Sequence, residues 1–109
     1  MDQTALDSIE LHDAVLLSLK VDYVERVTVV EINFYEDQKI RKRSSANIRF
    51  SNVKSISHIV DLRQLKVNAA AGNVTYWWPA VDKKTYLYLA GGCLIVEAAS
   101  VEFERTIRE

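Results

Sequence analysis

Hydrophobic and polar residues alternate along the first half of the chain, as they do in strands that bury one face. Residues 13–23 show this period of two, and their apolar side carries Val15, Leu17, Leu19 and Val21. Residues 26–35 are rich in β-branched and aromatic residues, and their shared apolar side carries Val30, Ile32 and Phe34. A short turn between the two segments predicts that Leu19 lies opposite Val30 and that Leu17 lies opposite Ile32.

A third strand is predicted within residues 40–51. Its apolar side carries Ile40, Ala46, Ile48 and Phe50, and its polar side carries Arg41, Arg43, Asn47 and Arg49. Because a slip of one residue would turn every side chain to the other face, this pattern favours a turn of odd length near residues 36–39. That turn predicts that Ala46 lies beside Val30 and that Ile48 lies beside Thr28.

The segment from residue 52 to residue 73 has the least regular pattern. It can extend the third strand to about Ser57, after which Asp61 can cap a short helix through Leu62 and Leu65. Gly72 is then the stop signal of that helix. A fourth strand in this segment is the alternative interpretation.

The second half of the chain predicts three further strands, at residues 72–80, 85–90 and 93–104. The Gly91–Gly92 pair between apolar runs is a strong signal for a two-residue hairpin turn, because such turns need positive φ. This turn predicts four cross-strand pairs: Leu89 with Leu94, Tyr88 with Ile95, Leu87 with Val96 and Tyr86 with Glu97. Pro79 has no N–H to donate, so it places its segment at a sheet edge or a strand end.

The turn that precedes residue 85 decides which aromatic rings face outward. A four-residue loop puts Trp78 opposite Leu87 and Trp77 opposite Tyr88. The core face then carries Val74, Tyr76, Trp78, Leu87, Leu89, Leu94, Val96 and Ala98, and the outward face carries Trp77, Tyr86, Tyr88, Cys93, Ile95 and Glu97. A loop of odd length instead moves Trp77 to the aliphatic side and leaves Tyr76 and Trp78 with the two tyrosines.

Together these segments predict a mainly β fold in one domain of residues 1–109. Two three-stranded antiparallel meanders, joined by a middle segment with at most a short helix, would form one twisted sheet, a sandwich or an open barrel. The chain of 109 residues is long enough to bury one core.

Composition narrows the classes of partner and compartment. The net charge is −1, so no overall field attracts nucleic acid or a membrane surface. Cys93 is the one cysteine, which excludes an internal disulfide. The N-terminal residues lack the basic and apolar regions of a secretion signal, and no apolar run is long enough for a membrane helix. We therefore expect a cytoplasmic protein.

Two surfaces are candidate binding sites. The first is the outward aromatic face, whose predicted contact residues are Trp77, Tyr86, Tyr88, Ile95 and Glu97; tyrosine and tryptophan combine contact area with a polar group and are enriched in binding hot spots. The second is the basic row Arg41, Arg43 and Arg49, which can meet phosphates or carboxylates. The simpler interpretations are an aromatic face covered by other segments and a solvated basic strand with partners such as Glu31.

The sequence predicts no catalytic residue, no metal site and no cofactor. His12 and Asp13 are neighbours in a predicted strand, where adjacent side chains point to opposite faces, so we expect no acid–base pair there. His12, His58 and one carboxylate lack the spacing of metal ligands. Cys93 has neither a histidine base nor a basic neighbourhood, which a nucleophilic cysteine needs.

The layout of the chain resembles that of small bacterial β-rich families, some of which are similar to immunity proteins of toxin–immunity systems. The resemblance rests on "HDA" before an alternating strand, on "NIRFSNVKSI", and on glycine-turned strands near the end. It implies a protein that binds a partner and carries over no functional residue. The arginine side departs from the acidic surface expected of nuclease inhibitors.

We therefore expect a non-enzymatic protein-interaction module that binds a partner protein, or itself as a dimer, through the aromatic face. The alternative is a site for a small ligand or single-stranded nucleic acid, in which the rings stack and the arginines hold anions.

Overall fold

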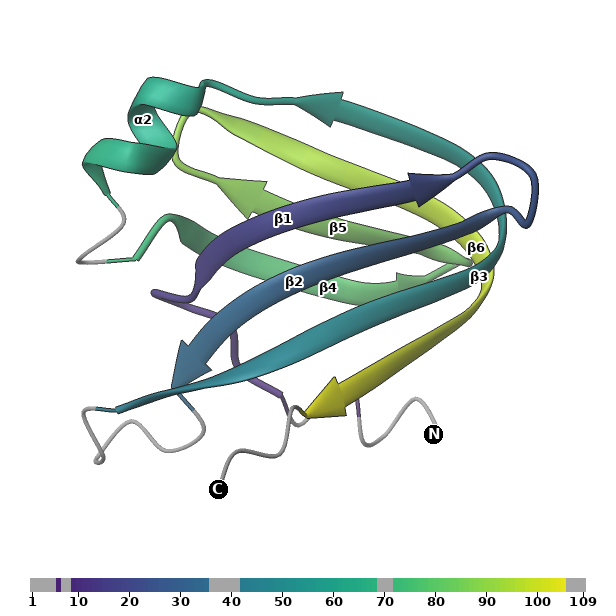
Figure 1. Ribbon diagram of the computed structural model, residues 1–109, viewed down its shortest axis with the longest axis horizontal. Coiled ribbons are helices and arrows are strands. Elements are labelled where there is room, and N and C mark those ends of the chain that lie inside the picture. Colours follow the sequence, from purple (N-terminus) through teal and green to yellow (C-terminus); the bar gives the residue numbers. More distant parts are fainter. Residues whose placement is uncertain (1–5, 7–8, 36–41, 69–71, 106–109) are drawn as a thin grey trace.

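The computed structural model describes residues 6, 9–35, 42–68 and 72–105. Its elements are β1 (Val15–Asp22), β2 (Val27–Tyr35), β3 (Arg43–Ile59), α2 (Leu62–Val67), β4 (Val74–Val81), β5 (Lys84–Leu89) and β6 (Gly92–Arg105). All six strands belong to one antiparallel sheet of order β1-β2-β3-β6-β5-β4 (Figure 1). The predicted mainly β fold with a short helix is confirmed, and the two meanders join through β3 and β6.

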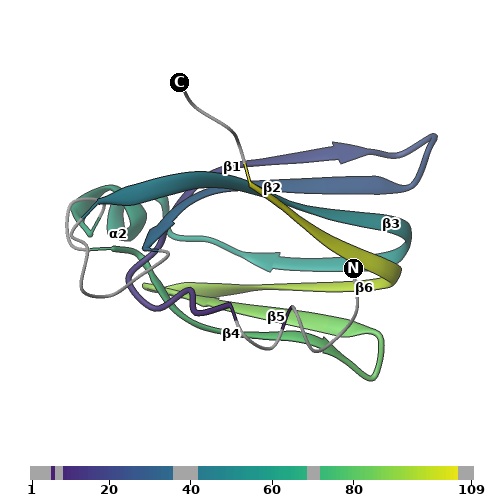
Figure 2. The ribbon, with the colours of Figure 1, turned by 90° about the horizontal axis from the view of Figure 1, so that it is seen from below.

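The sheet folds over on itself because β3 and β6 are long enough to belong to two layers. They contain 17 and 14 residues. In Figure 2, β1, β2 and the first half of β3 form one layer, and β3 then turns back toward the layer of β4 and β5. A register shift between Val53 and Ser55 follows Asn52, whose φ is 52°, and marks this bend. Bulges of this kind bend a strand and increase its twist.

The hydrophobic core fills the space between the two layers. Phe103 packs edge-to-face against Phe34 with ring centroids 5.2 Å apart, and it also contacts Trp77 at 6.4 Å. The other large contributors are Val30, Ile32, Ile48, Phe50, Val74, Leu87, Leu89, Leu94 and Val96. The apolar faces predicted for β2 and β3 therefore both point into the core.

Leu6 and residues 9–14, which precede β1, cover one side of this core. Leu6 and Leu11 are buried, and the Nε1–H of Trp77 donates to the Ile9 carbonyl at 2.9 Å. The Asp13 N–H donates to the Val74 carbonyl at 3.0 Å, so this segment also reaches the edge strand β4. Within the described residues, no helix is long and apolar enough to cross a membrane.

The register between β1 and β2 confirms one predicted pairing and corrects the other. Leu19 lies opposite Val30 as predicted, but a shift between Leu16 and Ser18 pairs Leu16 with Ile32 and leaves Leu17 exposed. The extra residue of a bulge has no partner, so Leu17 loses the place that strict alternation gave it.

Between β2 and β3 the predicted faces are right but the register is wrong by two residues. Val30 pairs with Ile48 and Thr28 pairs with Phe50. A displacement of two residues keeps every side chain on its face, which explains why alternation alone could not detect it.

The middle segment follows the first of its two interpretations. β3 continues to Ile59, and the Asp61 carboxylate then caps α2 by accepting from the N–H groups of Arg63 and Gln64 at 3.0 and 3.1 Å. The helix ends at Val67 with Asn68 as its C-cap, so Gly72 is not its stop signal. A Cβ at Gly72 would lie 2.3 Å from the Asp13 carbonyl oxygen, which shows that this glycine allows two segments to cross closely.

The last hairpin turns one residue earlier than predicted. Leu89 pairs with Gly92, Leu87 with Leu94 and Tyr86 with Ile95, so the turn residues are Ala90 and Gly91. Gly91 has the positive φ of 79° that the glycine pair led us to expect. The shift again preserves the faces. As Pro79 indicated, β4 is an edge strand of the sheet.

Candidate functional site

Trp77 lies on the core side of the sheet, so the prediction that it belongs to the outward face is wrong. It is 4% exposed and pairs with Leu87 on the core side. The reason is the turn between β4 and β5, which consists of Asp82 and Lys83 at φ 52° and 65°, together with a register shift between Trp78 and Val81. Together they place the side chains as a loop of odd length would, which is the alternative that the sequence left open.

The same register turns Tyr76 and Trp78 outward. A four-residue loop would have placed both side chains in the core. Tyr76 pairs with Tyr88, and Trp78 pairs with Tyr86. Their exposed fractions are 49% for Tyr76, 47% for Trp78 and 40% for Tyr88, while Tyr86 is half-buried. We call these four residues the aromatic face.

The rings of the aromatic face also contact one another along each strand. Tyr86 and Tyr88 stack with centroids 6.3 Å apart and an interplanar angle of 12°. Tyr76 and Trp78 meet edge-to-face at 6.1 Å and 77°. Four rings on two neighbouring strands therefore hold each other in place on a rigid support.

The outward face continues from β5 onto β6 with less exposed residues. Ile95 and Cys93 lie opposite Tyr86 and Tyr88, and both are half-buried. Glu97 follows on the same side, where Lys54 Nζ lies 3.8 Å from its carboxylate and the Ser55 hydroxyl lies at 3.5 Å. The structure thus brings together four of the predicted contact residues: Tyr86, Tyr88, Ile95 and Glu97.

The basic row lies on the other layer and does not join the aromatic face. Arg43 and Arg49 belong to the first half of β3, which Figure 2 shows in the layer of β1 and β2. Arg49 lies opposite Glu102 of β6, so the surface around it carries both signs of charge. Arg41 lies outside the described residues.

Arg43 supports the fold more than it presents a charge. Its guanidinium lies 4.8 Å from the centre of the Tyr35 ring, and its Nη2 donates to the Asp13 carbonyl at 3.2 Å. The cation–π contact and the hydrogen bond connect the start of β3 with residues before β1. These contacts favour the interpretation of the basic row as part of a structured, mixed-charge surface.

His12 has a closer polar neighbour than the alternation predicted. Asp13 has a φ of 66°, which breaks the strand pattern, and its carboxylate lies 3.6 Å from His12 Nε2. His12 Nδ1 lies 3.0 Å from the Thr75 carbonyl oxygen. The hydrogen bond to Thr75 and, next, the charge of Asp13 raise the pKa of His12. Among the described residues, no group of three or more potential metal ligands occurs.

Comparisons with models of protein families, with curated proteins and with solved structures each gave no match. The resemblance to immunity proteins therefore stays a prediction. The fold and the surface define a folded-over antiparallel sheet with an aromatic face on the edge strand β4 and its neighbour β5. The function has to be argued from the chemistry of that face.

Proposed function

We propose that this protein is a non-enzymatic interaction module that binds another protein, or a second copy of itself, through the aromatic face. The observation that carries the proposal is the exposure of Tyr76, Trp78 and Tyr88 on neighbouring strands. A contiguous patch of large rings on a soluble surface is typical of an interface, because covering it removes apolar area from water.

The rigidity of the support also favours binding. Rings that are already ordered by stacking and edge-to-face contacts lose little conformational entropy when a partner covers them. Each tyrosine and tryptophan keeps one polar group that can bond to a partner at the rim of the contact. Lys84 and Glu97, which pair across β5 and β6 beside the rings, supply charges of both signs for that rim.

The alternative in which rings and arginines hold one nucleic-acid strand loses support from this geometry. Stacking and anion binding would need to act along one continuous groove. The aromatic face lies on a different layer from Arg43 and Arg49, so a short strand cannot contact both.

We expect Trp78→Ala and Tyr88→Ala to weaken association by about tenfold or more, because truncated aromatic hot spots cost at least about 1.4 kcal/mol. Thermal melting should change little. Sedimentation equilibrium over a range of concentrations measures self-association, and Tyr23→Ala is the matched control, since Tyr23 is 87% exposed outside the face.

If the wild-type protein is monomeric, a photo-crosslinking residue at position 88, with position 23 as control, should capture a partner that also binds when both proteins are purified. Crosslinking of equal yield at both positions, or reconstituted binding that Trp78→Ala leaves unchanged, would contradict the proposal. Trp77→Ala is the contrasting case, since removing this buried ring should destabilise the fold by about 3–5 kcal/mol.

A further inference from the structure

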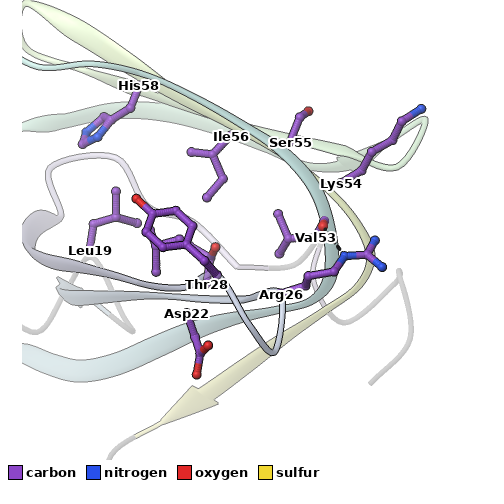
Figure 3. Close-up of a pocket in the computed structure, with 11 residues that line it drawn as sticks. Leu19, Asp22, Arg26, Thr28, Val53, Lys54, Ser55, Ile56 and His58 are labelled. Carbon is purple, nitrogen blue, oxygen red and sulfur yellow. Dashed lines mark hydrogen bonds between the residues drawn. The ribbon is translucent and has the colours of Figure 1, made fainter.

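A cleft of about 690 Å³ opens between the two layers, away from the aromatic face (Figure 3). One wall comes from β1 and β2, and the other comes from the part of β3 beyond its bend. In Figure 3, Leu19 approaches from β1 while Ile56 and His58 point toward it from β3. Strand pairing explains the opening, because β1 pairs with β2 and this part of β3 pairs with β6.

Hydrogen bonds hold the two walls together at the bend of β3. The Val53 N–H donates to the Arg26 carbonyl at 2.9 Å, and Arg26 Nε donates back to the Val53 carbonyl at 3.0 Å. Asp22 accepts from the N–H groups of Val24 and Glu25 at 3.1 and 3.0 Å, which fixes the neighbouring turn. The cleft is therefore built between anchored strands.

The inner lining of the cleft is apolar and its charges lie toward the mouth. The apolar side chains are Leu19, Val21, Val53 and Ile56. The charged and titratable groups are Asp22, Tyr23, Arg26, Lys54 and His58, and all five are exposed. Clefts of this size with apolar walls and few polar groups are typical of small-molecule sites.

One polar atom in the lining has no partner. Thr28 is 0% exposed, and its hydroxyl oxygen makes no hydrogen bond within the described part of the chain. In Figure 3 its side chain points from β2 toward the space between Leu19 and Val53. A buried hydroxyl without a partner is costly, and valine would fill the same position without that cost.

We propose that the cleft binds an uncharged, largely apolar small molecule that places one hydroxyl or carbonyl oxygen on the Thr28 hydroxyl. The apolar walls accept the body of such a ligand, and the buried, unpartnered hydroxyl of Thr28 suits one neutral hydrogen bond. A charged head at that depth would be left without a counter-ion. Thr28 is fully covered, so the lining side chains around it must shift before a ligand reaches its oxygen.

Methyl-detected NMR titration with 2-naphthol and naphthalene tests this inference. The two probes share an apolar body, and only 2-naphthol carries a hydroxyl. Both should shift the methyl signals of Leu19, Val53 and Ile56, and 2-naphthol should bind more tightly. Shifts centred on Ile95 would place the probes on the outer face and overturn the inference, as would equal affinities.

Thr28→Val separates the hydrogen bond from the shape of the site. We expect it to lower the affinity for 2-naphthol by about three- to tenfold, the worth of one neutral hydrogen bond, and to leave naphthalene binding unchanged. It should also raise the melting temperature, because it removes the buried hydroxyl. An unchanged ratio of the two affinities would overturn the role of Thr28.

Two further variants keep the test independent of folding effects. Thr85→Val is the matched control, since Thr85 is a buried threonine on β5 that does not line the cleft, and it should leave both affinities unchanged. Ile56→Trp should fill the cleft and abolish binding of both probes. Binding that survives Ile56→Trp would locate the probes elsewhere and contradict the proposal. None of these outcomes depends on the aromatic face.

Discussion

Buried polar side chains connect parts of this fold that are distant in sequence, and Asn73 is the clearest case. Its N–H donates to the Ala14 carbonyl at 2.9 Å, and its Oδ1 accepts from the Leu16 N–H at 2.8 Å. Its Nδ2 donates to the Leu65 carbonyl in α2 at 3.0 Å. One side chain therefore links the start of β1, the helix and the start of β4.

Asn73→Asp should lower the free energy of unfolding by about 2–3 kcal/mol. Aspartate cannot donate to the Leu65 carbonyl, and its charge would be buried without a counter-ion. Urea unfolding measures the change. Asn68→Asp is the matched control, because the Asn68 amide makes an exposed bond to the Gln64 carbonyl at 2.8 Å. Equal losses in the two variants would mean that burial of Asn73 is not the decisive factor.

His12 should make stability depend on pH. Its raised pKa in the folded protein means that the folded state binds the proton more tightly than the unfolded state does. The stabilisation is therefore complete below the unfolded pKa of about 6.5 and is lost as pH rises through the raised value. His12→Gln should destabilise the protein more at about pH 6 than at about pH 8, as measured by urea unfolding. A pH-independent difference would contradict this assignment.

At the scale of secondary-structure elements, close approach of backbones determines where the last hairpin turns. A Cβ at Gly92 would lie 2.0 Å from the Ile59 carbonyl oxygen, at the point where β3 ends and β6 begins. Gly91 supplies the positive φ of the turn itself. The two glycines therefore have different roles, although the sequence suggested that both belong to the turn.

Gly92→Ala should destabilise the protein by about 2–3 kcal/mol, because the ends of β3 and β6 must move apart. Cys93→Ala, which removes a half-buried thiol at the next position, should cost less than about 1 kcal/mol. Thermal melts of both variants provide the comparison. A Gly92→Ala variant as stable as wild type would show that the two strand ends separate without cost.

At the scale of the whole molecule, the two edges of the sheet have unequal protection. β3 and β6 lie at the centre of the strand order, and residues before β1 bond to the edge strand β4. The edge strand β1 borders the open cleft instead. Local stability should follow this arrangement, since exposed edges open more readily than central strands.

Hydrogen exchange should therefore be slowest for the amides paired between β3 and β6 and fastest, among strand amides, in β1. Protection in β4 should be intermediate because the N-terminal segment covers its edge. Exchange followed by NMR resolves the individual amides. Protection in β1 equal to that in β6 would mean that the cleft is closed in solution.

Alternation and turn residues were enough to predict the strands, their order along the chain and most of their faces. Val30, Ile32 and Phe34 are buried together as predicted, and Asp61 caps the helix. These features depend on local chemistry, namely the period of two in a strand and the need of a helix for an N-cap. For the same reason, Tyr86, Tyr88, Ile95 and Glu97 could be placed on one side of the sheet.

Bulges and close backbone crossings could not be predicted from the sequence, because tertiary packing determines them. The extra residue at Leu17, the register shift after Trp78 and the choice of Ala90 as a turn residue each depend on what packs against the strand. A single inserted residue moves every following side chain to the opposite face of the sheet. Trp77 therefore points into the core, and Tyr76 and Trp78 point outward. The fold of the sheet into two layers, which separates the arginines from the rings and opens the cleft at Thr28, follows from long-range packing that no local pattern encodes.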